Sequence, residues 1–490
     1  MCDRHWRCTV VVPRLRAIAT TEDAMSTRRE HDLLGDREVP AHVYWGVHTL
    51  RAVENFPISG VPVGANADLV VALATIKQAA AEANRSLDLI DAARTDAIVR
   101  ACEEIRAGQW HGEFVVDAIQ GGAGTSTNMN ANEVIANRAL EFLGRERGDY
   151  AALHPNEHVN LGQSTNDVYP TAVKLAVWTG AQRLAASLAA LRAAFAAKAI
   201  EFADVLKVGR TQLQDAVPMT LGQEFGAYAT TLAEDEARLA EAIVFLREIN
   251  LGATAIGTGI TAHPRYAEAV RARLSALVGV AFVTAPDLIE ATQDCGVFVL
   301  VSGALKRIAV KLSKICNDLR LLSSGPRAGF NEINLPARQA GSSIMPGKVN
   351  PVIPEVVNQI AFEVIGNDLT ITLAAEAGQL QLNAFEPIVA HSLHKSVEHL
   401  RRGIDTLATH CIAGITANRE RLADQVRRSV GIVTALNPYL GYARATELAA
   451  EVLASGRDVR EVVARHGLLP ADVLDRVLAP EALTRPVAVG

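Results

Sequence analysis

The segment Val297–Leu322 constrains the fold of this chain more than any other feature of its sequence. Its apolar residues recur at spacings of three and four, which is the period of one face of an α-helix. They are Val297, Leu300, Val301, Ala304, Leu305, Ile308, Ala309, Leu312, Ile315, Cys316 and Leu319. At 1.5 Å per residue the predicted helix is about 39 Å long. Gly325 followed by Pro326 ends it. Long helices of this kind invite packing against other subunits; the alternative is a monomer whose long helices pack on each other.

Other segments repeat the helical pattern. The longest are Thr171–Glu201, Leu221–Leu246, Pro354–Leu373 and Pro387–Ala413. Alanine, the residue that costs least in a helix, is abundant, and aromatic residues make up only 5%. We therefore predict a mostly α fold with a central bundle of about five long helices.

Shorter elements are expected before this bundle. Asp32–Phe56 lacks helical periodicity and is predicted as loop and short strand. Ala67–Ala107 is helical with a break near Ser86–Ile90, and a further helix is expected near Glu133–Leu143. We predict an N-terminal domain over 26–164, the bundle over 165–418 and a small domain over 419–490. Residues 1–25 are expected to be a disordered extension, with Met25 as the physiological start.

Composition and missing motifs exclude several classes of function. The net charge is −6, which gives no reason to expect nucleic acid or an anionic membrane as a partner. The six cysteines form no CxxC pair and indicate a reduced, cytoplasmic protein. No apolar run is long enough to span a membrane. The sequence has no P-loop, no GxGxxG after a strand, no HExxH and no GxSxG. We expect no dedicated metal site.

Four polar loops remain as candidates for chemistry, all rich in hydroxyl and amide groups and poor in charge. They are Gly121–Asn130, Gln163–Asp167, Gly209–Asp215 and Gly341–Asn350. Capping of the helices that follow would explain any one of them. Four together favour a site for a small dicarboxylate, since donors without carboxylates suit an anion. In Gly341–Pro351 glycines accompany Ser342, Ser343 and Lys348, which suggests a loop that closes over its substrate.

At this point the residues resemble the aspartase/fumarase superfamily. The segment GSSIMPGKVNP (341–351) is similar to the signature loop of that superfamily over its whole length. GGAGTSTNMNANEV, GQSTNDVYP and GRTQLQDAVPMTLGQE agree in order and spacing. The flanks LLGDREVPAHVYWGVHTLRAVENF and PVIPEVVNQ are most similar to the aspartase branch. The resemblance implies a three-domain helical fold and a homotetramer whose active sites each draw loops from three subunits.

The resemblance also implies roles for particular residues. Ser342 would be the general base that takes a proton from the β-carbon of L-aspartate, giving an enediolate-like intermediate and then fumarate. The substrate β-carboxylate would be held by Thr125, Ser164, Thr165 and Ser343. The α-carboxylate would be held by Thr211, Lys348 and Asn350. Asn166 matches a position near the leaving amine, and Glu355 a partner just outside the site.

Two positions depart from the fumarases. Gln212 stands where fumarases and some aspartases carry histidine, and a glutamine cannot donate a proton as an acid. Ala123 occupies a position where fumarases often have serine. Both favour elimination of ammonia over elimination of water. Fumarate hydratase remains the alternative within the superfamily. A non-catalytic relative that keeps only the helical scaffold is the alternative outside it. No cofactor is expected to be required, although some relatives respond to a divalent cation such as Mg²⁺.

Overall fold

A computed structural model describes residues 26–486 of the chain. The expected extension over 1–25 lies outside these residues, as do Cys2 and Cys8. The remaining cysteines, Cys102, Cys295, Cys316 and Cys411, are buried and free. Contacts divide the chain into two compact units. The first runs to Thr165 and includes Thr261–Gly279; the second comprises Asn166–Ile260 and the chain from Val280 onward. The predicted three-domain boundaries stay a prediction.

The first unit is built around α2 (Ala67–Ser86), which packs against α3 (Ala92–Arg106) and α7 (Tyr266–Val278). The predicted break near Ser86–Ile90 is confirmed, because α2 ends there and Asp91 caps α3 through the N–H of Arg94. The other elements are the antiparallel pair β1 (Thr27–Asp32) and β2 (Gly35–Pro40), with α1 (Val47–Asn55) and α4 (Thr125–Phe142).

Two helices of this unit differ from the sequence prediction. Val47–Asn55 was expected as loop or strand but forms α1, because distant carboxylates satisfy its first N–H groups. Glu133 accepts hydrogen bonds from the N–H of Gly46 and His48 at 2.8 Å, and Glu30 accepts from Val47 at 2.8 Å. Only glycine fits at position 46, since a Cβ there would lie 2.5 Å from Glu30 Oε2.

The helix α4 begins at Thr125 rather than near Glu133. Gly124 precedes it in the left-handed region, at φ 87°. The side chain of Gln120 accepts the N–H of Thr127 at 3.0 Å, so a side chain outside the helix caps its first turn. The residues Thr125–Asn132, predicted as loop, are therefore helical.

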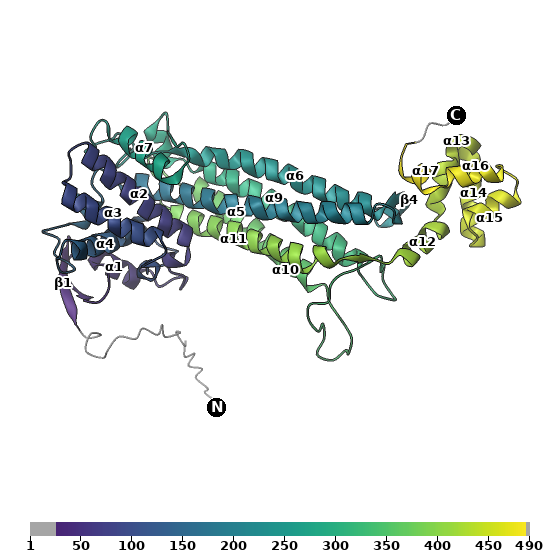
Figure 1. Ribbon diagram of the computed structural model, residues 1–490, viewed down its shortest axis with the longest axis horizontal. Helices are drawn as coiled ribbons and strands as arrows, with labels where there is room; N and C mark the ends of the chain where they lie inside the picture. The colour runs from purple at the N-terminus through teal and green to yellow at the C-terminus, as the bar shows by residue number, and fades with distance from the viewer. Residues whose placement is uncertain (1–25, 487–490) are drawn as a thin grey trace, which may run out of the picture. The chain divides into compact units, whose positions relative to one another are not determined.

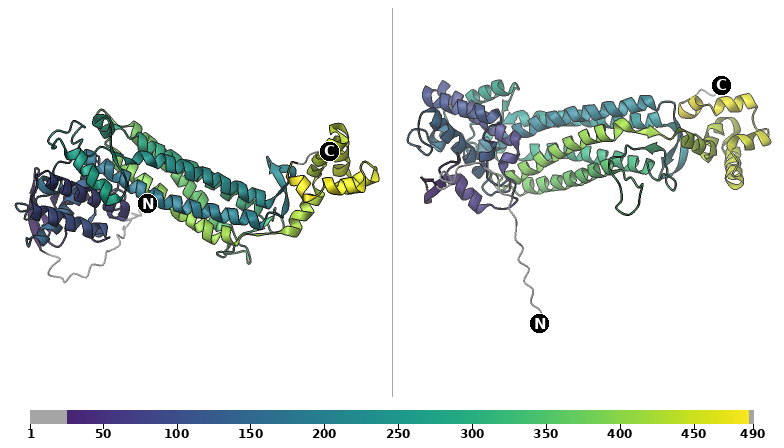
Figure 2. Two further views of the ribbon diagram at one scale, coloured as in Figure 1. Left: turned by 45° about the horizontal axis from the view of Figure 1, so that its top comes forward. Right: turned by 60° about the horizontal axis from the view of Figure 1, so that its bottom comes forward.

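The second unit contains the predicted bundle (Figures 1 and 2). Its long helices are α5 (Thr165–Glu201), α6 (Leu221–Val244), α9 (Gly296–Leu322), α10 (Val352–Glu376) and α11 (Glu386–His410). The helix α9 packs against α6, α10 and α11 and buries the apolar stripe identified in the sequence. The expectation of about five long helices is confirmed. No helix within residues 26–486 is long and apolar enough to cross a membrane.

The start of α5 shows how tertiary contacts extend a helix past a proline. Pro170 lies inside α5 and has no N–H to give to the carbonyl of Asn166. The side chain of Asn250 donates to that carbonyl instead, at 3.1 Å. The helix therefore begins six residues before the predicted Thr171.

The predicted loop Gly209–Asp215 is the tip of an antiparallel hairpin made by β3 (Leu206–Thr211) and β4 (Gln214–Thr220). Gln212 and Leu213 form the turn, with φ values of 53° and 63°. Two-residue hairpin turns of this hand usually contain Asn or Gly, which this sequence lacks, so the pattern gave no hairpin signal.

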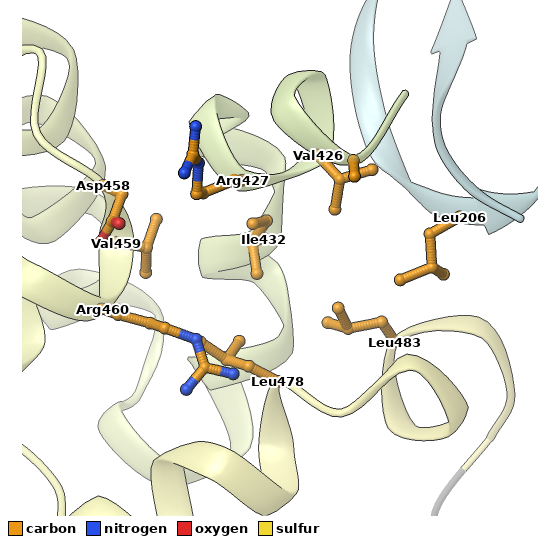
Figure 3. A pocket seen from close by; sticks show the side chains of 10 residues that line it. Leu206, Val426, Arg427, Ile432, Asp458, Val459, Arg460, Leu478 and Leu483 are labelled. Carbon is orange, nitrogen blue, oxygen red and sulfur yellow. The ribbon is translucent and has the colours of Figure 1, made fainter. Parts of the chain in front are cut away.

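A C-terminal piece follows the bundle (Figure 1). Its helices are α12 (Arg419–Arg428), α13 (Asn437–Leu440), α14 (Tyr442–Ser455), α15 (Val459–Arg465), α16 (Ala471–Val477) and α17 (Pro480–Thr484). Their shared core includes Val208 of β3, which ties this piece to the hairpin. A cavity of about 190 Å³ lies beside that core, with Leu206, Ile432 and Leu478 among the side chains that line it (Figure 3).

The remaining elements are short. They are the parallel pair β5 (Glu248–Ile249) and β6 (Val283–Thr284), the antiparallel pair β7 (Ile333–Asn334) and β8 (Thr416–Ala417), and α8 (Leu288–Gln293).

Candidate functional site

The loop Gly341–Pro351 is closed at its neck by backbone contacts. The N–H of Gly341 donates to the carbonyl of Lys348 at 2.8 Å. The side-chain amide of Asn350 donates to the carbonyl of Gly341, also at 2.8 Å. A Cβ at position 341 would lie 2.8 Å from both the Asn350 nitrogen and the Lys348 oxygen, so this close approach requires glycine. Asn350 therefore fixes the base of the loop.

Ser342 stands just inside this neck with its oxygen held by the backbone. Its Oγ accepts hydrogen bonds from the N–H of Met345 at 2.9 Å and of Ile344 at 3.2 Å. Backbone donors aimed at one oxygen stabilise negative charge on it. The side chain is half-buried, whereas the following Ser343 and Lys348 are exposed. This arrangement suits a serine that must become an oxyanion in order to act as a base.

A cavity of about 640 Å³ lies along the second half of the loop. Lys348 and Asn350 line it from the loop side, and Arg320 lines it from the last turn of α9. This space exceeds the size of a four-carbon dicarboxylate, and two cationic side chains border it. Glu355 lies in the first turn of α10, where the helix dipole favours a negative charge.

In the first unit, a second group of predicted residues is held by a buried polar network. Thr165 Oγ1 accepts a hydrogen bond from Asn128 Nδ2 at 3.0 Å. Asn160 Oδ1 accepts from Asn128 at 3.2 Å and from the ammonium of Lys77 at 2.8 Å. Lys77 is fully buried and also donates to Gln163 Oε1 at 2.9 Å. We call these five residues the Lys77 network.

The direction of these bonds matters for binding. Because Asn128 donates to the oxygen of Thr165, the hydroxyl proton of Thr165 is left to donate elsewhere. A hydroxyl oriented in this way suits a carboxylate oxygen. The nearby predicted residues Thr125 and Ser164 lie at the first residue of α4 and just before α5. Thr125 is exposed and Ser164 is half-buried.

The sequence interpretation did not identify Lys77 or Asn128 as site residues. Lys77 had a usable signal, because it is a charged residue among the alanines and leucines of α2. A lysine is almost never fully buried unless its ammonium group is paired, so a lysine in an apolar helix face indicates a buried polar network around it. Asn128 belongs to the polar segment that was singled out, but its inward direction follows from the early start of α4.

The second unit holds the other predicted residues at two ends of its bundle. Asn166, at the start of α5, donates to the carbonyl of Ala255 at 2.6 Å. Thr211 and Gln212 are exposed at the hairpin tip, beyond the far end of α5. The loop with Ser342 follows α9 at that same far end (Figure 1). Since α5 has 37 residues, its ends are about 55 Å apart. Asn166 and Ser342 of one chain therefore cannot meet at one substrate.

Comparison with known families shows which superfamily the chain belongs to. Residues 35–366 match the family model described as lyase, and residues 432–485 match the model described as fumarase C C-terminus. The chain belongs to the aspartase/fumarase superfamily. The first match includes every predicted site residue from Thr125 to Glu355. The expected superfamily and its mostly helical fold are confirmed.

Individual members of the superfamily are similar over nearly the whole chain. An aspartate ammonia-lyase of Pseudomonas fluorescens is 61% identical over 470 residues, covering 96% of this chain and 98% of that protein. A solved fumarate lyase:delta crystallin from Brucella melitensis, bound to cobalt, is 56% identical with a TM-score of 0.92, covering 94% of this chain and all of that one. A class II fumarase from Schistosoma mansoni is 34% identical with a TM-score of 0.89, covering 93% and 98%.

Proposed function

We propose that the protein is a carbon–nitrogen lyase that reversibly eliminates ammonia from L-aspartate to give fumarate. The observation that carries this proposal is the backbone cradle around Ser342 Oγ, set in the superfamily's signature loop. The similarity of nearly the full chain to an aspartate ammonia-lyase supports the same reaction. Fumarate hydratase is the less supported alternative, since the fumarase neighbour is only 34% identical.

The proposed reaction begins at the β-carbon of the substrate. Ser342, as an oxyanion stabilised by the N–H groups of Ile344 and Met345, takes the β-proton. The electron pair of the broken C–H bond moves onto the β-carboxylate and gives an enediolate-like intermediate. That pair then forms the carbon–carbon double bond as the carbon–nitrogen bond breaks, and ammonia leaves. The amino group of the substrate is protonated, so it keeps the electron pair of the broken carbon–nitrogen bond and leaves as ammonia without an acid. Gln212 can therefore only hydrogen-bond to it.

Two sets of donors bind the two carboxylates in this proposal. Thr125, Ser164, Thr165 and Ser343 receive the β-carboxylate, where charge develops and donors have the largest effect on rate. Thr211, Lys348 and Asn350 receive the α-carboxylate, with Lys348 as the fixed charge. Asn166 lies near the amine, and Glu355 acts from outside the site.

A homotetramer with each site built from three chains is part of the proposal. It is supported by the separation of Asn166 and Ser342 along one bundle. It is also supported by an exposed apolar face on α10, where Phe362, Leu369 and Leu373 are 63%, 60% and 59% exposed. Packing of this face against other copies would bury it and would bring the opposite ends of different bundles together.

The proposed reaction requires no cofactor, and the cytoplasm is its proposed location. Among residues 26–486 no three His, Cys, Asp or Glu side chains are grouped so that they could hold a metal ion. A divalent cation such as Mg²⁺ is proposed only as an activator. Activity with and without added Mg²⁺, after treatment with a chelator, tests this part of the proposal.

The deciding experiment follows fumarate by its ultraviolet absorbance with L-aspartate and L-malate as separate substrates. Fumarate from aspartate alone supports the ammonia-lyase. Fumarate from malate alone makes the chain a fumarase with an unusual Gln212. Fumarate from neither would favour a scaffold without this activity.

A further inference from the structure

A buried cluster of charges joins the hairpin β3–β4 to the segment that leads into the signature loop. Glu332 is fully buried. Its Oε1 accepts a hydrogen bond from the guanidinium of Arg210 on β3. Its Oε2 lies 2.9 Å from the ammonium of Lys207, which is 2% exposed and belongs to the same strand. Lys207 also donates to Glu224 of α6 at 2.6 Å. The charges of the two cationic side chains and the two carboxylates in this cluster therefore sum to zero.

The backbone around Glu332 is fastened independently of these charges. The N–H of Glu332 donates to the carbonyl of Leu322 at 2.8 Å, and the N–H of Asn331 donates to that of Ser324 at 2.9 Å. The carbonyl of Glu332 accepts from the N–H of Asn418 at 2.9 Å. The segment therefore stays attached to the end of α9 and to β8 whether or not the Glu332 side chain is charged.

The hairpin, in contrast, has a tip that needs support. Arg210 immediately precedes Thr211, and the turn residues Gln212 and Leu213 both have positive φ. Left-handed backbone at residues other than glycine costs energy and persists only where its surroundings impose it. The Arg210 guanidinium lies 4.3 Å from the centre of the Phe330 ring and reaches Glu332 beside it. These contacts connect the strand bearing Thr211 to the segment that leads to Ser342 and Lys348.

We propose that Glu332 is a positioning residue that holds the β3–β4 tip through Arg210, so that Thr211 and Gln212 are presented to the α-carboxylate and amine end of the substrate. This inference rests on the proposed function and extends it to a residue that never touches the substrate. The two ion pairs of the cluster therefore have different roles. The Glu332–Arg210 pair positions the β3–β4 tip, whereas the Lys207–Glu224 pair stabilises the fold.

The test compares two isosteric substitutions, Glu332→Gln and Glu224→Gln, in the full-length protein. Each removes one of the carboxylates around Lys207, but only the first removes the partner of Arg210. Glu332→Gln should lower kcat/KM for L-aspartate about 100-fold, since small displacements of positioning groups have effects of that size. Its KM and its inhibition constant for succinate should rise. Glu224→Gln should change kcat/KM by less than about threefold, because it leaves Arg210 paired with Glu332 and does not touch the proposed site.

The melting temperature of each variant is measured as well, because both substitutions should lower it. Activities are then compared at a temperature well below both melting temperatures. Arg210→Gln should reproduce the Glu332→Gln loss, and the double variant should be no worse than the poorer single variant, as expected of one shared contact. Arg210→Gln keeps the test decisive if Glu332→Gln folds poorly, because it breaks the same contact from the other side. Equal losses for Glu332→Gln and Glu224→Gln, or additive losses in the double variant, would overturn the inference. A wild-type protein that makes no fumarate from aspartate would overturn the proposed function and the inference together.

Discussion

The Lys77 network and the Gly341–Pro351 loop both carry hydrogen-bond donors, but those of the network are held by buried partners and those of the loop are exposed. In the network, Thr165 is backed by Asn128 and Asn160, and behind them by a fully buried ammonium. In the loop, Lys348 and Ser343 are exposed, and the apolar Ile344 is 84% exposed. Thr165 is therefore oriented before any substrate arrives. The short hydrogen bonds of the loop lie at its neck and around Ser342 Oγ.

This difference suggests a division of labour. Donors that must meet developing charge gain most from being held in place beforehand, because no energy is then spent on orienting them during the reaction. A base and a carboxylate-binding cation can arrive with a closing loop, which also excludes water. The exposed Ile344 fits a loop that becomes covered when it closes or when other chains pack against it.

The largest effect is expected at the loop. Ser342→Ala removes the proposed base and should lower kcat by about 10⁴-fold, near the upper end for general bases. The measurement is fumarate formation from L-aspartate, with size-exclusion chromatography to confirm an unchanged assembly. Near-normal turnover would remove Ser342 from the mechanism and would leave the loop with a binding role only.

The next largest effect is expected in the Lys77 network, at Thr165. Thr165→Val keeps the shape of the side chain but loses the O–H, and kcat should fall by about 10²- to 10³-fold, as for loss of one donor to an oxyanion. Thr165→Ser is the matched control, since it keeps the hydroxyl that Asn128 orients. Its rate should remain within about tenfold of wild type. A Thr165→Ser variant as poor as Thr165→Val would show that packing of the methyl group, and not the hydroxyl, matters.

Lys348→Met tests whether the exposed lysine binds the substrate. Loss of the fixed charge should weaken inhibition by succinate about 100-fold, within the range for truncating one partner of a charge pair in a binding site. Lys314→Met, which removes an exposed lysine of α9, is the control and should leave inhibition unchanged. Unaltered succinate affinity in the Lys348 variant would assign the α-carboxylate to other groups.

The smallest effect concerns the stability of the unit that holds the Lys77 network. Burial raises the pKa of Glu133 to about 7, and hydrogen bonds from Thr49, Gly46 and His48 offset part of that shift. Because the pKa in the folded protein lies above the ordinary 4.5, the folded state holds this proton more tightly than the unfolded state. The stabilisation is complete below pH 4.5 and is lost as the pH rises through 7.

Melting temperature should therefore fall by a few degrees between pH 5 and pH 8, and Glu133→Gln should flatten that dependence. Glu103→Gln, at an exposed position of α3, is the control and should leave it unchanged. A pH dependence that is the same in the Glu133→Gln variant and in wild type would assign the titration to another group.

Much of this molecule could be read from local sequence. The period of Val297–Leu322 predicted α9 to within one residue, and the break near Ser86–Ile90 was placed correctly, since periodicity and capping residues are local signals. The signature loop identified the superfamily, and the segments assigned to the site stay predictions. The roles assigned to individual site residues stay predictions.

Tertiary structure decided what local sequence could not express. The helix α1 starts where it does because Glu133, 87 positions from Gly46, supplies an acceptor from another helix. The helix α4 starts at Thr125 because the side chain of Gln120 turns back onto its first turn. The hairpin tip has a conformation that its own residues disfavour. The hydrogen bonds of the Lys77 network join residues up to 86 positions apart. The sequence by itself determined the long helices of the bundle and marked the segments proposed to carry the site, because helical period and residue type act over a few neighbouring residues. Only the fold decided which donors, such as Thr165, are oriented by hydrogen bonds within the protein. It also placed Asn166 and Ser342 at opposite ends of the bundle, because long-range packing sets such distances.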